Sequence, residues 1–204
     1  GLMAHLREQG VAFQDCNVAA LDGDTVTGTD GRRHPFEHLV IAAGAWSHRL
    51  TEQLGDWCPL ETERGYNTTL PSPGISLNRM LTFAEDHFVA TPMSMGLRIG
   101  GAVEFAGLKT PPNFNRSKAL LKLAAKYLPE LNVDGGTEWM GHRPSTPDSL
   151  PVIDRASQYS NIFYAFGHGH LGLTGSATTG RLIASLVRGE EVGLDLTPFR
   201  IGRF

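Results

Sequence analysis

The stretch NIFYAFGHGHLGLTGSATTGRLIASLVR, residues 161–188, carries the pattern that decides the fold. Its residues 162–166 are apolar and aromatic and too few for a helix, so they predict a buried strand. A glycine-rich loop follows, and apolar side chains then recur at helical spacing from Leu182 to Val187. Glycine lets a backbone approach a ligand, and a helix start offers free N–H groups. The stretch therefore predicts a cradle for a phosphate or a cofactor.

The loop matches the pattern G-x-G-x-x-G through Gly167, Gly169 and Gly172. A dinucleotide-binding motif of that kind needs a second parallel strand after the helix, with an acidic residue near the end of that strand. The acidic residues at 190 and 191 lie at a suitable distance, but a glycine and a proline follow them instead of an apolar strand. We therefore expect the loop to face another part of a cofactor, with a purely structural glycine turn as the alternative.

The chain has 204 residues, of which 41% are hydrophobic and 19% charged, so it can bury a core. The net charge of −3 and the lack of a basic block argue against nucleic acid as a partner. We expect no transmembrane segment and no signal peptide, because no apolar run has the necessary length. Cys16 and Cys58 are the two cysteines, and their wide separation favours a reducing, cytoplasmic compartment.

Residues 1–58 predict the first part of one domain. A short amphipathic helix opens it, a strand begins at Val11, and an antiparallel meander turns at residues 30–31. Residues 39–41 predict a buried strand, and the small residues 42–45 after it suit a backbone lying against a flat ligand. Close packing between strand and helix is the alternative. Ser47 is a candidate cap for the helix that follows.

Residues 59–140 predict a second, antiparallel domain with one helix that begins near Asn115, and residues 141–204 return to the first domain. The returning segment places Arg143 beside a tryptophan and a proline-rich loop. A guanidinium can bind a planar carboxylate through two parallel hydrogen bonds. A structural arginine paired with Asp148 or Asp154 is the alternative.

Four stretches together resemble the D-amino acid oxidase and dehydrogenase family of FAD-dependent oxidoreductases. They are LVIAAGAWS at 39–47, ERGYN at 63–67, GHRPSTPDSLPVI at 141–153 and GHGHLGLTGSATTGRLIA at 167–184. The resemblance implies an α+β and α/β fold, namely a partial FAD-binding domain of the glutathione reductase type with an antiparallel-sheet substrate domain. The N-terminal βαβ unit of such a domain has no counterpart in the first 38 residues, so the chain resembles the C-terminal half of such an enzyme.

The resemblance also implies where the cofactor and the substrate bind. It implies that Arg143 binds the substrate carboxylate and that Tyr66 and His170 line the substrate side. It implies a non-covalent FAD, which this chain alone would bind weakly or not at all because the ADP-binding unit is missing. The residues implied to contact the cofactor are Ala43, Gly44, Gly167, Gly169, Gly172, Leu173 and Thr174.

The implied reaction is oxidation of the C–N bond of an amino acid or a secondary amine, by hydride transfer to flavin. His170 and Leu171 stand where some sarcosine-oxidising relatives carry a lysine that assists reaction with oxygen, which favours a dehydrogenase with an unknown electron acceptor. The resemblance allows a homo-oligomer and a location in the cytoplasm or at the periphery of the inner membrane. A non-catalytic truncated domain or binding scaffold and an NAD-dependent dehydrogenase are the alternatives.

His168 and His170 form an H-x-H pair. Such a pair can ligate a metal, but a zinc site takes three or four protein ligands and no third candidate lies nearby in the sequence. We therefore expect no metal. Contact with the flavin and a structural role within the loop are the two alternatives for these histidines.

Overall fold

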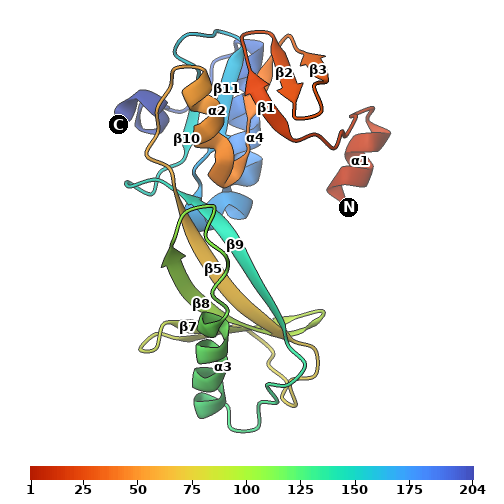
Figure 1. Ribbon diagram of the computed structural model, residues 1–204, viewed down its shortest axis with the longest axis vertical. Helices are drawn as coiled ribbons and strands as arrows, with labels where there is room; N and C mark the ends of the chain where they lie inside the picture. Colours follow the sequence, from red (N-terminus) through yellow and green to blue (C-terminus); the bar gives the residue numbers. More distant parts are fainter.

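The computed structural model describes residues 1–204 and has two lobes that lie end to end along one long axis (Figure 1). Both chain termini lie in the upper lobe of that view. The lower lobe contains a five-stranded antiparallel sheet and one long helix, α3 (Asn115–Tyr127). Two strands, β5 (Glu61–Leu70) and β9 (Thr137–Ser145), run from the upper lobe into the lower one.

The upper lobe contains two small sheets, three α-helices and several 3-10 turns. No helix of the molecule is both long enough and apolar enough to cross a membrane. The elements of the upper lobe are α1 (Leu2–Glu8), β1 (Val18–Leu21), β2 (Thr25–Gly28), β3 (Arg33–Pro35), β4 (Leu39–Ile41), η1 (Gly44–Trp46), α2 (Ser47–Gln53), β10 (Val152–Arg155), β11 (Ile162–Phe166), η2 (Gly169–Leu171), α4 (Gly172–Arg188), η3 (Thr197–Phe199) and η4 (Ile201–Arg203).

The strand β11 lies at the centre of the larger upper sheet, whose order is β10-β11-β4. It pairs in parallel with β4 and antiparallel with β10, and the other edge of β4 has no partner strand. Phe163 packs with Leu182 and Ile183 of α4 on one face, while Tyr164 packs into a second core on the other face. The predicted strands, glycine loop and helix are all present, and β11 is buried as predicted, whereas β4 is only partly buried because Val40 is exposed.

The lower sheet has the order β6-β7-β8-β5-β9, and every neighbouring pair is antiparallel. Side chains of β7, β8 and β5 pack against Leu120 and Ala124 of α3, which covers one face of the sheet. The antiparallel sheet that the predicted fold class includes is present, and β9 belongs to this sheet as well. The predicted domain boundary between residues 140 and 141 falls inside that strand. The remaining strands are β6 (Leu81–Phe83), β7 (Phe88–Met93) and β8 (Gly96–Phe105).

Two local predictions in the first 58 residues are wrong. No strand begins at Val11, because residues 11–16 join no sheet, and Val11 and Phe13 are 44% and 43% exposed. Ser47 is the first residue of α2, and its side chain caps no helix. The 3-10 turn η1 starts the helical path three residues earlier, which leaves the Ser47 hydroxyl buried without a hydrogen-bond partner.

Tyr164 and Asp56 form a buried hydrogen bond that fixes the upper core. The Tyr164 hydroxyl donates to Asp56 Oδ2 at 2.7 Å, and the Ser157 backbone N–H donates to the same oxygen at 3.0 Å. We expect Tyr164→Phe to lower the free energy of unfolding by about 1–3 kcal/mol, because the carboxyl group loses one of its two donors. Urea unfolding followed by circular dichroism measures this change.

Tyr159→Phe is the matched control for this substitution. Tyr159 packs against the same core, but its hydroxyl makes no hydrogen bond within the protein. Its loss should change the free energy of unfolding by less than about 0.5 kcal/mol. Equal effects of the two substitutions would contradict the role given to the Tyr164 hydroxyl.

Candidate functional site

A cleft of about 490 Å³ lies between the glycine loop of the upper lobe and the upper ends of β5 and β9. Its walls are the start of β5, the loop that follows β9, and residues 167–171. An isolated backbone bridge between Ser145 and His168 joins the end of β9 to the glycine loop. The cleft therefore brings together segments that lie about a hundred residues apart in the sequence.

The glycine loop is held closely against the loop after β9. Gly167 and Gly169 have φ angles of +81° and +51°, which favour glycine. A Cβ atom on Gly167 would lie 3.1 Å from the Thr146 side chain. His168 Nε2 forms a hydrogen bond with Thr179 Oγ1 of α4 at 3.0 Å, and burial lowers the pKa of this imidazole. A neutral His168 therefore ties the loop to the helix.

The start of α4 presents its positive dipole end without compensation from the chain. No side chain caps the helix, and its first turn contains no acidic residue. Gly172, Leu173 and Thr174 form this first turn, and the Leu173 side chain is 91% exposed. An electron-rich group placed here would be stabilised by the helix dipole.

A second hollow of about 350 Å³ lies beside α4, against the face formed by β4 and β11. Small side chains line it, including those of Ala42, Ala165 and Ser176. Ala43 and Gly44 lie elsewhere, because Ala43 faces a different hollow next to Val18 and Trp46. The structure thus places Ala42, rather than Ala43, beside the helix that follows the glycine loop. Successive residues of an extended chain face opposite sides, so continuing the alternation of β4 beyond Ile41 could have separated Ala42 from Ala43.

Arg143 lies on the face of the lower sheet that continues the cleft. Arg143 is directly opposite Glu63, and Gly141 is directly opposite Gly65, so all four residues share one face. The Arg143 guanidinium covers Gly65, where an added Cβ atom would lie 2.2 Å from Nη2. Arg143 Nη1 is buried and has no hydrogen-bond partner. The role of Arg143 in binding a carboxylate stays a prediction.

The alternative pairing of Arg143 with an aspartate is wrong. Asp148 accepts hydrogen bonds from Arg203 at 2.7 and 3.1 Å. Asp154 accepts a hydrogen bond from the backbone N–H of Ile201 at 2.9 Å. Both carboxylates thus bind the C-terminal segment, and neither pairs with Arg143.

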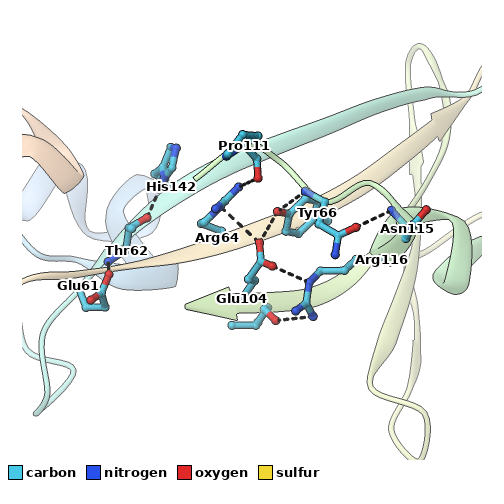
Figure 2. Close-up of polar contacts among 11 residues, drawn as sticks. Glu61, Thr62, Arg64, Tyr66, Glu104, Pro111, Asn115, Arg116 and His142 are labelled. Atoms are coloured by element: carbon cyan, nitrogen blue, oxygen red, sulfur yellow. Dashed lines mark hydrogen bonds and ion pairs between the residues drawn. The ribbon is translucent and has the colours of Figure 1, made fainter. Parts of the chain in front are cut away.

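Tyr66, which was predicted to line the substrate side, does not line this cleft. Strand alternation places it on the opposite face of β5 from Gly65, and its side chain is only 1% exposed. Its hydroxyl donates to Glu104 and accepts a hydrogen bond from the Asn113 backbone N–H at 3.1 Å (Figure 2). The motif located the correct strand, but the structure gives Tyr66 a role in packing against the α3 side.

Glu104 gathers three side chains on that opposite face. It lies 3.5 Å from Arg64 Nε and 3.2 Å from Arg116 Nε, and it accepts the Tyr66 hydroxyl bond (Figure 2). Hydrogen bonds from Tyr66 and Arg116 hold the pKa of Glu104 below its usual range. This cluster ties β5 to β8 and to the start of α3 behind the cleft.

His170 lies in the cleft, as predicted, and contacts a carboxylate that the sequence analysis missed. Its Nε2 is 3.3 Å from Glu63 Oε2, and the Ser145 hydroxyl donates to the same oxygen at 2.7 Å. His168 bonds to Thr179 instead, so the two histidines of the H-x-H pair have different partners. Residues two apart in a strand share one face, so the position of Glu63 two residues before Gly65 could have identified it from the sequence.

Asp148 and Arg203 anchor the loop that forms one wall of the cleft. The hydrogen bond from Arg203 lowers the pKa of Asp148 to about 2. A lowered carboxyl pKa stabilises the fold above its ordinary value near 4, and this stabilisation is lost as the pH falls towards 2. We expect Asp148→Asn to be less stable than the wild type at pH 6 and nearly equal to it at pH 2. Urea unfolding across this range measures the difference, and a constant difference would contradict the pairing.

A short mixed sheet, a glycine loop and a helix that face a second lobe across a cleft form an arrangement that is typical of cofactor-dependent enzymes. The chain belongs to the FAD dependent oxidoreductase family, whose model matches residues 1–186. This confirms the family identified from the sequence motifs.

Two curated relatives share extended stretches with this chain. A D-amino-acid oxidase of Bradyrhizobium diazoefficiens is 43% identical over 169 residues, which cover 81% of this chain and 40% of the relative. A D-amino acid dehydrogenase of Paramagnetospirillum magneticum is 33% identical, over 90% of this chain and 44% of the relative. The chain therefore spans less than half the length of these two relatives.

A solved structure of glycine oxidase from Geobacillus kaustophilus is similar with a TM-score of 0.78 and 25% identity, over 94% of this chain and 52% of that one. Iminodiacetate oxidase from a Chelativorans species has a TM-score of 0.81 at 21% identity, over 98% of this chain and 56% of that one. The second similarity shows the fold alone.

Proposed function

We propose that the protein containing this chain oxidises the C–N bond of an amino acid or a secondary amine with FAD as its cofactor. The observation that carries the proposal is the Arg143 guanidinium, which lies fixed on Gly65 with a buried Nη1 that has no partner in the chain. Arg143 makes no hydrogen bond or ion pair within the chain, so the remaining nitrogens of its guanidinium are free to bind a ligand carboxylate.

The residues of the upper lobe fit a flavin. The uncapped start of α4, with Gly172, Leu173 and Thr174, offers a positive dipole end to an electron-rich ring edge. Gly167 and Gly169 lie on the wall of the cleft and have no side chains to block the approach of a ring. We propose that these five residues contact the cofactor. The ADP half would bind outside residues 1–204, so we expect FAD binding by these residues alone to be weak.

When bound, the flavin supplies the two-electron acceptor for a hydride that leaves the substrate α-carbon. The work of this chain is then to bind and orient the substrate. Arg143 would hold the carboxylate by two parallel hydrogen bonds, and the walls of the cleft would exclude water from the reacting carbon. His170, on the wall across from β5, would line the same space.

The names of the relatives support an amino acid as the substrate. The names D-amino-acid oxidase, D-amino acid dehydrogenase and glycine oxidase all give an amino acid as the substrate. A carboxylate is the group that these substrates share. The fixed guanidinium of Arg143 is the matching group in this chain.

Arg143→Ala in the intact FAD-bound protein tests the proposal. A charge-assisted pair is worth about 1.5–3 kcal/mol, so kcat/KM for amino acids should fall about 10- to 150-fold, mainly through a higher KM. Arg143→Lys keeps the charge but loses the bidentate geometry and should retain part of the activity. Unchanged kcat/KM in the alanine variant would refute the proposed role of Arg143.

Gly65→Ala makes an independent test without altering the guanidinium itself. The new methyl group would overlap Arg143 Nη2, and the flexible arginine would move aside. We expect KM for amino acids to rise while the thermal unfolding temperature stays within about 2 °C of the wild type. In an Arg143→Ala background the same change should have no further effect on KM. A rise of similar size in that background would contradict the contact.

A further inference from the structure

Glu63 and Arg143 are opposite charges at directly opposed positions of β5 and β9. Opposed residues of an antiparallel pair have Cβ atoms about 4.5–5.5 Å apart, and opposite charges at such positions normally attract each other. In this protein the two side chains turn away from each other and form no ion pair. Arg143 lies over Gly65, and the Glu63 carboxylate turns towards the glycine loop.

Two neighbours hold the Glu63 carboxylate in place. The Ser145 hydroxyl donates to Oε2 at 2.7 Å, and His170 Nε2 lies 3.3 Å from the same oxygen. Oε1 makes no hydrogen bond within the protein, and the side chain is only 20% exposed. One oxygen of a largely buried carboxylate is therefore available on the wall of the cleft.

A different contact keeps the Arg143 guanidinium away from Glu63. The missing side chain at Gly65 leaves the space that its guanidinium fills, and any methyl group there would overlap it. Its Nη1 is buried without an acceptor. Glu63 and Arg143 thus lie next to each other on one face of the sheet, with opposite charges and with no ion pair between them.

We propose that Glu63 binds the amino group of the substrate while Arg143 binds its carboxylate. This inference rests on the proposed function. An amino acid in water carries an ammonium and a carboxylate on one carbon, and the two neighbouring charges of this sheet match that arrangement. Taking an ammonium group out of water is costly unless an anionic partner receives it. Glu63 is then the residue that distinguishes an amino acid from a simple carboxylic acid.

Glu61 is the other carboxylate near the cleft, and it is less suited to this role. It is exposed and lies opposite Ser145, nearer the rim. Its Oε1 accepts a hydrogen bond from the neighbouring Thr62 backbone N–H at 2.7 Å. Glu61 therefore supplies a matched control, because it carries the same charge on the same strand.

The test compares two ligands of the same carbon skeleton. The first has an amino group but cannot be oxidised at the α-carbon, and the second lacks the amino group. 2-Aminoisobutyrate has no α-hydrogen, and isobutyrate is the same acid without the amino group. Their dissociation constants are measured in the intact FAD-bound protein from changes in the flavin absorbance. We expect Glu63→Gln to weaken 2-aminoisobutyrate at least tenfold and to leave isobutyrate within about twofold of the wild type.

The controls separate this inference from the proposed function. Arg143→Ala should weaken both ligands, and Glu61→Gln should change the ratio of their dissociation constants by less than about twofold. Glu63→Asp, with retained flavin, is a second variant and should show an intermediate loss for 2-aminoisobutyrate. If Glu63→Gln weakens both ligands equally or neither, Glu63 does not bind the amino group, although the function stands. If the wild type binds neither ligand, the carboxylate site fails and this inference fails with it.

Discussion

The antiparallel pairing of β5 with β9 is the interaction on which the cleft depends. It runs from Glu61 and Ser145 to Thr69 and Thr137 without a register shift, and it places Glu63, Gly65 and Arg143 on one face. A slip of one residue would turn all of them to the other face. The same two strands pass between the lobes, so the pairing also sets where the glycine loop meets the sheet.

The two faces of β5 have different roles in the structure. One face holds the charges and small residues of the cleft, and the other holds the buried cluster around Glu104. Arg64 and Tyr66 flank Gly65 in the chain, and both are anchored on the far face, Arg64 through a bond to the Pro111 carbonyl at 2.9 Å. Anchors on both sides of Gly65 keep its backbone still, which a precise position for the Arg143 guanidinium requires.

The sequence predicted the elements better than the directions of their side chains. Apolar runs identified β4 and β11, and glycine with a helical period identified the loop and α4, because these signals are local. The motif around Tyr66 predicted the right strand but the wrong face, since a motif shows that a strand exists and leaves its orientation to the partner strands. Glu63 was missed because its importance arises from a residue eighty positions later. Ser47 was misread because the 3-10 turn before it extends the helical path.

The strand β4 pairs on one side only, and Val40 in it is 39% exposed. An unpaired strand edge is a template for another backbone, and a parallel strand is normally buried on both sides. The free backbone groups of β4 can therefore pair with a strand of another molecule, so residues 1–204 would tend to self-associate in solution.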